Sequence, residues 1–414
     1  MIKKKIFLLF ILITIIGCAV FYKGNYLKHK LLTSLPSHYQ VVLQVIHKPE
    51  RVKHFKNDYN VNFLPKTQFI DLNYIEKKLD FKPFENISSS YSNEEKNISF
   101  KIGLYKDLIY TIDNKANVKR FMLTLNKGSI ELIDYKNVPT NIEDTALVID
   151  FLIHDEIIYI SYLLDTKNCK YLKIAKSKIN IMPLDFKAIY NPDFCFDNLE
   201  AASIQFYEHD DVKGLLISIS SSQLTGQDDA QDLKSIQGKI LFLNLKNNKS
   251  NVFSYGHRSP QGLLVLNDVI ISTEHGPKGG DEINKIEFNG NYGWPLSSYG
   301  EPYYEKAFKP LLDKNHEKNN FIEPIYSFVP SIGISDIIKL PNLFSPYWEN
   351  NFILASLNNK SLFRLKFDDK YSKIIYYERI FIGKRIRDVK YYRNINAILL
   401  AQEYDGTLGI LFNK

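Results

Sequence analysis

The 414-residue chain has little charge of one sign, few cysteines and few long segments of helical periodicity. Its 53 lysine and arginine residues against 46 aspartate and glutamate residues leave a net charge of only +7, which excludes the basic footprint of a nucleic-acid-binding protein. With 19 glycines and 16 prolines, the chain is also far from a low-complexity or collagen-like composition. The remaining composition, 45% hydrophobic and 24% charged, is that of a globular protein.

The three cysteines are Cys18, Cys169 and Cys195. No C-x-x-C pair is present, which excludes clustered zinc sites and thioredoxin-type redox chemistry. In an exported protein Cys169 and Cys195 could form one disulfide, but they could equally be two buried thiols. The sequence leaves both possibilities open.

The N-terminus predicts export. Residues 1–5 carry three lysines, and residues 6–22 form an uncharged, mostly apolar run, the pattern of an export signal. The run includes IIGC at residues 15–18, which resembles the bacterial lipoprotein box and would place a lipid on Cys18. The alternative is an uncleaved membrane anchor, since the run at about 1.5 Å per residue spans roughly 25 Å. Both predict a protein on the periplasmic side of a bacterial membrane, attached through residues 6–22 or through lipid on Cys18.

The rest of the chain predicts an all-β fold. Length alone favours two or three domains of about 150 residues. From residue 60 onward, however, short apolar or alternating runs follow one another between Asn, Asp, Gly and Lys turns, and 27 tyrosines and 27 phenylalanines suit strands. Residues 71–79 are a candidate for one short helix. The roughly eighteen to twenty-two strands are too many for one barrel or sandwich and favour a β-propeller of four-stranded blades, although no WD or kelch repeat is visible. We therefore expect a signal or anchor at 1–22, a tether at 23–60 and one propeller at 61–414.

One segment carries a family resemblance. Residues 256–295 read GHRSPQGLLVLNDVIISTEHGPKGGDEINKIEFNGNYGWP. This stretch resembles the soluble pyrroloquinoline quinone (PQQ)-dependent glucose and aldose sugar dehydrogenases, the glucose/sorbosone dehydrogenase family, with its G-x-R-N-P-Q-G, E-H-G-P-x-G-G-D-E-x-N and N-Y-G-W-P motifs. The resemblance extends over about residues 100–414 and is strongest from about 228. It implies a six-bladed β-propeller with the quinone and a Ca²⁺ ion at one mouth of the central channel.

The resemblance also implies site residues, and their chemistry is suitable. Ca²⁺ prefers oxygen ligands, and the backbone carbonyls of Gly276 and Pro277 inherit the family's role of binding the cofactor's Ca²⁺. Arg258, Arg385 and Arg387 inherit contacts with the quinone, whose carboxylates a guanidinium group binds with two hydrogen bonds.

A second, structural Ca²⁺ site is implied at Glu282 and the carbonyl of Tyr292. Each assignment has a structural alternative: the 276–280 stretch as a plain tight loop, the arginines at 385 and 387 as structural ion pairs, and the acids at 281 and 282 as partners of nearby surface lysines. Tyr292 would pack around a turn whatever else it does. His257 and His275 are expected to be hydrogen-bonded structural residues.

The sequence departs from the family at the proton acceptor. The family's catalytic histidine falls at or near Leu199, where no histidine is present, and a Gly-Asp pair has become Ser220-Ser221. Ser259 and Asn358 replace two further cofactor-site residues, an asparagine and a lysine. Glu200 is the candidate replacement base, with Asp197 nearby.

These observations predict a membrane-tethered, extracytoplasmic protein that oxidises a sugar or alcohol with PQQ and calcium. The alternative is a catalytically inactive propeller that binds a glycan, a small ligand or a protein partner. A lactonase-type propeller is disfavoured because no His-His dyad or acidic cluster is recognisable. The sequence predicts no oligomeric state.

Overall fold

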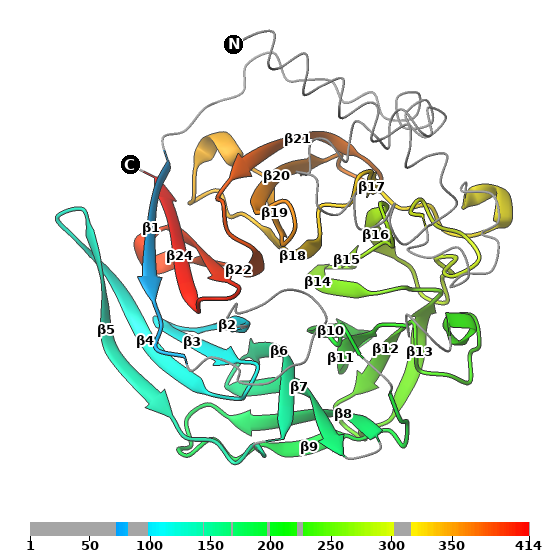
Figure 1. Cartoon of the computed structure of the whole chain (residues 1–414), viewed down its shortest axis with the longest axis horizontal. Helices are drawn as coiled ribbons and strands as arrows, with labels where there is room; N and C mark the ends of the chain where they lie inside the picture. Colours follow the sequence, from blue (N-terminus) through cyan, green and yellow to red (C-terminus); the bar gives the residue numbers. More distant parts are fainter. Residues whose placement is uncertain are drawn as a thin grey trace, which may run out of the picture. The chain divides into compact units, whose positions relative to one another are not determined.

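The computed structural model describes residues 72–81, 98–143, 145–166, 169–196, 199–221, 227–301 and 316–413. These residues form six four-stranded antiparallel sheets arranged around a centre (Figure 1). The prediction of an all-β propeller is confirmed, and it has six blades. The residues that the structure describes thus form one propeller rather than two or three separate folds.

Each blade begins with its innermost strand. The first three blades are β2 (Phe100–Tyr105), β3 (Leu108–Asp113), β4 (Val118–Asn126) and β5 (Ser129–Val138); β6 (Ala146–His154), β7 (Ile157–Thr166), β8 (Cys169–Lys178) and β9 (Lys187–Tyr190); and β10 (Ile204–His209), β11 (Val212–Ile219), β12 (Lys239–Asn244) and β13 (Ser250–Tyr255). The last three are β14 (Pro260–Leu266), β15 (Val269–Glu274), β16 (Asp281–Ile286) and β17 (Tyr326–Phe328); β18 (Ile334–Lys339), β19 (Phe352–Ser356), β20 (Ser361–Phe367) and β21 (Ile374–Phe381); and β22 (Ile386–Tyr392), β23 (Ala397–Gln402), β24 (Thr407–Asn413) and β1 (Leu72–Lys78). Short 3₁₀ helices lie at η1 (Gln227–Ala230), η2 (Glu317–Asn319), η3 (Pro346–Trp348) and η4 (Arg393–Ile395).

The ring is closed by the first described strand. β1 pairs antiparallel with β24, so that Leu72 lies opposite Asn413 and Lys78 opposite Thr407. The prediction of a short helix at 71–79 is therefore wrong. Exposure alternates along the second half of β1, the period of a strand, and β1 covers a sheet edge that would otherwise be unpaired.

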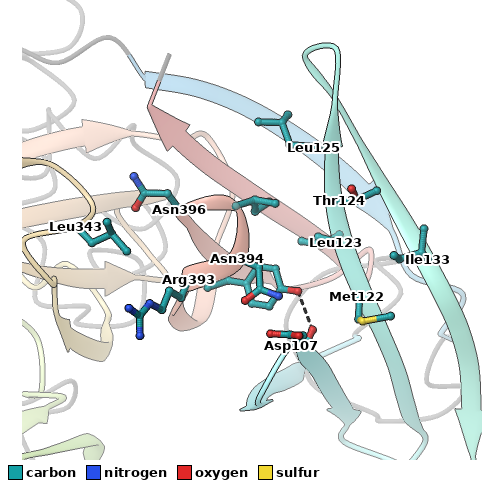
Figure 2. Close-up of a pocket in the computed structure, with 12 residues that line it drawn as sticks. Asp107, Met122, Leu123, Thr124, Leu125, Ile133, Leu343, Arg393, Asn394 and Asn396 are labelled. Carbon is teal, nitrogen blue, oxygen red and sulfur yellow. Dashed lines mark hydrogen bonds between the residues drawn. The ribbon is translucent and has the colours of Figure 1, made fainter.

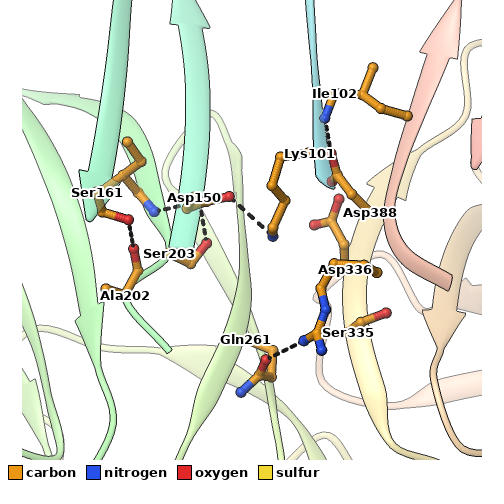
Figure 3. Close-up of polar contacts among 12 residues, drawn as sticks. Lys101, Ile102, Asp150, Ser161, Ala202, Ser203, Gln261, Ser335, Asp336 and Asp388 are labelled. Atoms are coloured by element: carbon orange, nitrogen blue, oxygen red, sulfur yellow. Dashed lines mark hydrogen bonds and ion pairs between the residues drawn. The ribbon is translucent and has the colours of Figure 1, made fainter. Parts of the chain in front are cut away.

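Neighbouring blades are joined by aspartates on the inner strands. Three of them, each at a register shift of its strand, accept a backbone N–H from the next blade's inner strand. The pairs are Asp150 with Ile204 (2.8 Å), Asp336 with Val389 (3.3 Å) and Asp388 with Ile102 (2.7 Å), and Figure 3 shows part of this network. Each of these contacts links the inner strand of one blade to the inner strand of the next blade around the channel.

The propeller therefore has two distinct ends. Connections between blades, and those after the second strand of each blade, lie at one end, which we call the motif end because it includes residues 256–259 and 275–280. Connections after the first and third strands begin at the opposite end, which includes residues 106–107, 340–351 and 393–396, but the long β16–β17 connection returns to the motif end, where Tyr292 and Trp294 lie beside Arg258.

Cys169 and Cys195 form a disulfide in blade two, with their Cα atoms 5.3 Å apart. Of the two possibilities that the sequence leaves open, the structure has the paired one. Residues 6–22 and Cys18 lie outside the described residues, as do the predicted segments 1–22 and 23–60. Within the described residues, no helix has the length and apolarity to cross a membrane.

Candidate functional site at the motif end

The motif residues come together because of the strand pairing in blade four. Residues 256–259 lead into β14, and residues 275–280 connect β15 to β16. The register places Pro260 opposite Glu274, and Glu274 opposite Glu282. The two halves of the motif therefore meet at one edge of one sheet.

The 275–280 loop is fixed by a buried aspartate. The carboxylate of Asp281 accepts N–H groups from Gly276 (3.0 Å), Ile332 (2.9 Å), Gly333 (2.6 Å) and Ile334 (3.1 Å). Asp281 is 1% exposed, so the alternative of a surface ion pair with a lysine is wrong for this residue. The loop is thus tied to the start of blade five, which holds the Gly276–Pro277 backbone in place.

Arg258 lies against the same loop. One terminal nitrogen donates to the carbonyl of His275 (2.8 Å), and the guanidinium lies over the Trp294 ring, 5.5 Å from its centroid. The Nε of Arg258 is buried and has no hydrogen-bond partner among the described residues. This leaves one donor of a buried cation available to a ligand.

The two histidines of the motif differ. His257 is hydrogen-bonded to Ser254 (2.8 Å) and Glu274 (3.0 Å), as expected of a structural histidine. For His275, in contrast, the buried Nε2 atom has no partner within the described part of the chain. Burial lowers the pKa of His275, and Arg387 and Arg258 lower it further, against the opposing charges of Asp281 and Glu200. His275 thus lies within electrostatic reach of Glu200 and Arg387.

Arg385 and Arg387 converge on one carboxylate. The Nε atoms of Arg385 (2.8 Å) and Arg387 (2.6 Å) both donate to Glu403, and Arg387 also reaches Gln261 (3.2 Å). Burial raises the pKa of Glu403, but the two guanidinium groups outweigh it, and the net shift is downward. The structural pairing that was one of two alternatives for these arginines is present, and it holds the Arg387 guanidinium between Glu403 and Gln261.

A pair of buried carboxylates lies beside the loop. The amide of Asn284 donates to both Glu274 (3.4 Å) and Glu282 (3.2 Å). Burial raises the pKa of Glu282 well above its usual range, and the charge of Glu274 raises it further. A cavity beside them is lined also by Gly276, Pro277 and Tyr292. The centre of a water molecule can occupy about 10 Å³ of it, so the cavity suits one water molecule or one ion.

Tyr292 is held rigidly by side-chain contacts. Its hydroxyl donates to the carbonyl of Lys285 (2.6 Å) and accepts from the N–H of Glu287 (2.8 Å), and its ring stacks on His257 at 4.5 Å. Tyr292 is 3% exposed. The packing role expected around this turn is present, and it fixes the backbone next to the cavity.

Leu199, at or near which the sequence predicts the family's catalytic histidine to fall, lies one residue before Glu200. Leu199 is buried in a core cluster, whereas Glu200 is exposed at the motif end. The hydroxyl of Ser220 accepts the N–H groups of Glu200 (3.0 Å) and Ala201 (3.3 Å), which fixes the backbone there. Asp197 lies outside the described residues.

Sequence reasoning missed Glu274, Asn284 and Glu403. Nothing in the spacing of Glu274 and Glu282 shows that they face each other across a hairpin, because the length of the turn sets that register. The one available sequence signal was the position of Glu274, directly before His275 in the motif.

Together, the fold and the cluster define a six-bladed propeller with a polar site at one end of its channel. A profile of the Glucose / Sorbosone dehydrogenase family matches residues 116–410, and the chain belongs to this family. It is 28% identical over 215 residues to the aldose sugar dehydrogenase YliI of Escherichia coli, covering 48% of this chain and 57% of the relative. It is 30% identical over 202 residues to the quinoprotein glucose dehydrogenase B of Acinetobacter calcoaceticus, covering 34% and 42%. These matches thus span less than two thirds of either relative.

Solved structures share the fold. The apo form of the soluble aldose sugar dehydrogenase from Escherichia coli superposes with a TM-score of 0.62 at 16% identity, over 83% of this chain and 99% of that one. The PQQ-bound aldose sugar dehydrogenase from Streptomyces coelicolor gives a TM-score of 0.55 at 16% identity, over 84% and 100%. At this identity the likeness concerns the fold alone.

Proposed function

We propose that this chain oxidises an aldose sugar or a similar alcohol with PQQ as the hydride acceptor. The observation that carries the proposal is the convergence of Arg258, His275 and the Gly276–Pro277 backbone, with two buried polar atoms lacking partners among the described residues. The names of the two curated relatives supply the substrate class and the cofactor.

The donor set suits a quinone that carries carboxylates. When bound, PQQ supplies the acceptor for the hydride that leaves the substrate carbon. Arg258 can offer its Nε donor, and Arg387 is held in orientation by Glu403 and Gln261, with Arg385 on the same carboxylate. Guanidinium groups fixed in this way bind carboxylates with little loss of side-chain entropy.

The acids beside the loop suit a calcium ion. Glu274 and Glu282 share one amide beside a small cavity, an arrangement that a divalent cation would relieve. Glu282 and the carbonyl of Tyr292 would hold the structural ion. The carbonyls of Gly276 and Pro277 would hold the ion that accompanies the quinone.

Glu200 is the proposed proton acceptor for the substrate hydroxyl. It is an exposed carboxylate at the motif end, fixed through its backbone by Ser220 and in electrostatic contact with His275. In this role it would replace the family's histidine, whose position is occupied by the core residue Leu199.

We also propose attachment to a membrane through residues 6–22 or through lipid on Cys18, with residues 23–60 as a tether. The Cys169–Cys195 disulfide supports an oxidising, extracytoplasmic compartment. Metabolic labelling with a fatty acid distinguishes the two modes, because Cys18→Ser abolishes labelling only if Cys18 carries the lipid.

A second candidate function is favoured by one observation. Because Leu199 is packed into the core at the position of the family's base, the propeller could bind its ligand without turning it over. A chain that binds PQQ and calcium but oxidises no sugar would support this reading.

The test is reconstitution of the full chain with PQQ and Ca²⁺, followed by sugar-dependent reduction of an artificial dye. We expect turnover with at least one aldose, and its loss in Arg258→Ala. The matched control is Arg379→Ala, on the outer strand of blade five, which should retain turnover. Absence of turnover with every sugar, despite cofactor binding, would favour the second candidate.

A further inference from the structure

Among the described residues, the end of the propeller opposite the motif loops carries most of the exposed large apolar side chains. At the motif end, the exposed apolar residues of the described chain are Leu233, in the connection after β11, and Phe381, at the end of β21. Tyr74, Ile133 and Tyr377 lie on outer strands. The other exposed apolar residues of the described chain lie at or next to connections of the opposite end.

Part of this surface is a groove with a volume of about 640 Å³ (Figure 2). It lies between the β4–β5 hairpin of blade one and the β22–β23 connection of blade six. Its apolar lining includes Leu125, Ile133 and Leu343, which are 44%, 40% and 55% exposed. Asp107 and Arg393 also line it, so the groove does not present charge of one sign.

The apolar residues continue around the ring beyond this groove. They lie in connections of blades two, three, four and five, and are Ile181, Met182, Val212, Phe288 and Tyr347. A protein partner would need one contiguous apolar patch, whereas these side chains are distributed over loop tips at the same end of five blades. Exposed charges share these turns, among them Asp155, Glu156 and Asp211, so the apolar side chains would enter a lipid boundary singly, between polar residues that stay in the headgroup region.

The N-terminal segment joins the propeller at the same end. Leu72, the first residue of β1, lies opposite Asn413 and packs against the core cluster that contains Phe344. The carbonyl of Phe344 accepts hydrogen bonds from both Asn413 and Asn396, and Asn396 lines the groove. Residues 1–71, which include the apolar run at 6–22, are therefore followed in the chain by a residue that lies close to the groove.

We propose that the opposite end is a membrane-docking face, which rests on the lipid headgroup region while the motif end faces water. This inference rests on the proposed attachment through residues 6–22 or Cys18, which raises the local concentration of lipid so that weak loop contacts suffice. The side chains would reach about 5–10 Å into the boundary between headgroups and acyl chains. Because the groove has charges of both signs, the contact is apolar and largely independent of salt.

The test places a tryptophan probe at each end of the full chain. Leu343→Trp reports on the opposite end and Leu233→Trp, at a residue of similar exposure, on the motif end; the two native tryptophans are buried and contribute a constant background. Each variant is reconstituted into vesicles of phosphatidylglycerol and brominated phosphatidylcholine, whose bromines quench nearby indoles. We expect emission of Leu343→Trp to fall by about half and that of Leu233→Trp to stay unchanged.

A second pair of variants tests whether quenching also occurs away from the groove, and not at Leu343 alone. Phe288→Trp should be quenched, and Phe381→Trp, at the motif end, should not. Quenching at neither end, or equally at both ends, in protein that floats with the vesicles would overturn the docking face while leaving the attachment intact. Failure to float at all would instead contradict the proposed attachment, and with it the docking inference. Neither readout depends on sugar oxidation.

Discussion

At the scale of single residues, the two carboxylates of Glu274 and Glu282 are the least expected feature of the site. Acids this deeply buried are usually paired with a cation or neutralised by protonation. Glu274 has contacts with His257 and with the N–H of Arg258, whereas the hydrogen bond found for Glu282 is the one from Asn284. Glu282 is therefore the acid on which we expect a bound cation to have the larger effect.

We expect Glu282→Gln to remove calcium-dependent stabilisation. A ligand at one hundred times its Kd stabilises a folded protein by about 2.7 kcal/mol, and most of this gain should disappear in the variant. In calcium-free protein the raised pKa of Glu282 means that the folded state holds a proton that the unfolded state has lost. Stability of the wild type should therefore fall as pH rises above about 4.5, and this slope should weaken in the variant.

The measurement is the urea midpoint with calcium and with a chelator, over a pH series. Glu287→Gln, at the turn after β16, is the control and should respond to calcium as the wild type does. Equal calcium stabilisation in Glu282→Gln and wild type would exclude this residue as a ligand.

We expect Glu200→Gln to lower kcat by about 10²–10⁴-fold, because general bases typically contribute that much. Cofactor binding should be unchanged, since Glu200 lies outside the arginine cluster. Glu208→Gln, at the other end of β10, is the matched control. An unchanged kcat in Glu200→Gln would mean that another group, such as His275, accepts the proton.

The residues that stand within the motif could be located from the sequence, and the partners that pair with them from distant strands could not. Arg258, Gly276 and Pro277 stand within a recognisable string of letters and do lie together at the motif end. Glu403 is distant in sequence from the arginine at 258, and its role depends on how the last blade returns to the channel.

At the scale of strands, the inner aspartates and two lysines form a partly buried network along the inner strands. Lys390 contacts Asp336 (2.8 Å) and Asp388 (2.7 Å), and Lys101 contacts Asp150 (3.1 Å), as Figure 3 shows in part. Burial raises the pKa of Asp388 to about 7, and the charge of Asp336 contributes to the rise, against the pull of the lysines. The network thus holds a proton near neutral pH.

We expect Asp388→Asn to flatten the pH dependence of stability. Because the folded pKa of Asp388 is raised, the folded state binds more protons than the unfolded state between pH 4 and 7. The free energy of unfolding of the wild type should fall across that window, by on the order of a few kcal/mol. An asparagine keeps the acceptor for the N–H of Ile102 and removes the titration.

Chemical unfolding at several pH values checks this prediction. Asp369→Asn, on an exposed turn, should retain the slope of the wild type. A slope in Asp388→Asn equal to that of the wild type would show that the proton is held elsewhere in the network.

Strand positions followed well from the sequence because apolar runs bounded by turns define them. The role of the inner aspartates did not follow from the sequence, because an isolated acid in an apolar run is typical of a break in a strand. The error at 71–79 has the same origin: a short segment with charges at close spacing fits either period, and only the unpaired edge of β24 selects the strand.

At the scale of the whole molecule, closure depends on one N-terminal strand. Ile75 of β1 packs against the core cluster between blades six and one, which also contains Leu408 and Ile410. The outer edge of the last blade is therefore completed by a segment far away in sequence. The number of strands predicted a propeller of four-stranded blades, but no local sequence signal predicts the pairing of β1 with β24.

We expect Ile75→Asp to destabilise the propeller by about 2–4 kcal/mol, because it places a charge in a partly buried apolar contact. Lys78→Asp, at an exposed position of the same strand, should cost much less. Urea unfolding measures the difference, and limited proteolysis should cut the Ile75→Asp protein first near the last blade. Similar stability in the two variants would show that β1 does not close the ring in solution.

The central claim is that the motif end binds PQQ through Arg258 in the presence of calcium, and calorimetric titration of the calcium-loaded full chain with PQQ tests it most directly. We predict one saturable site per chain in the wild type and in Arg379→Ala, and loss of that site in Arg258→Ala. Absence of binding in the wild type, or binding of equal strength in Arg258→Ala, would contradict the account.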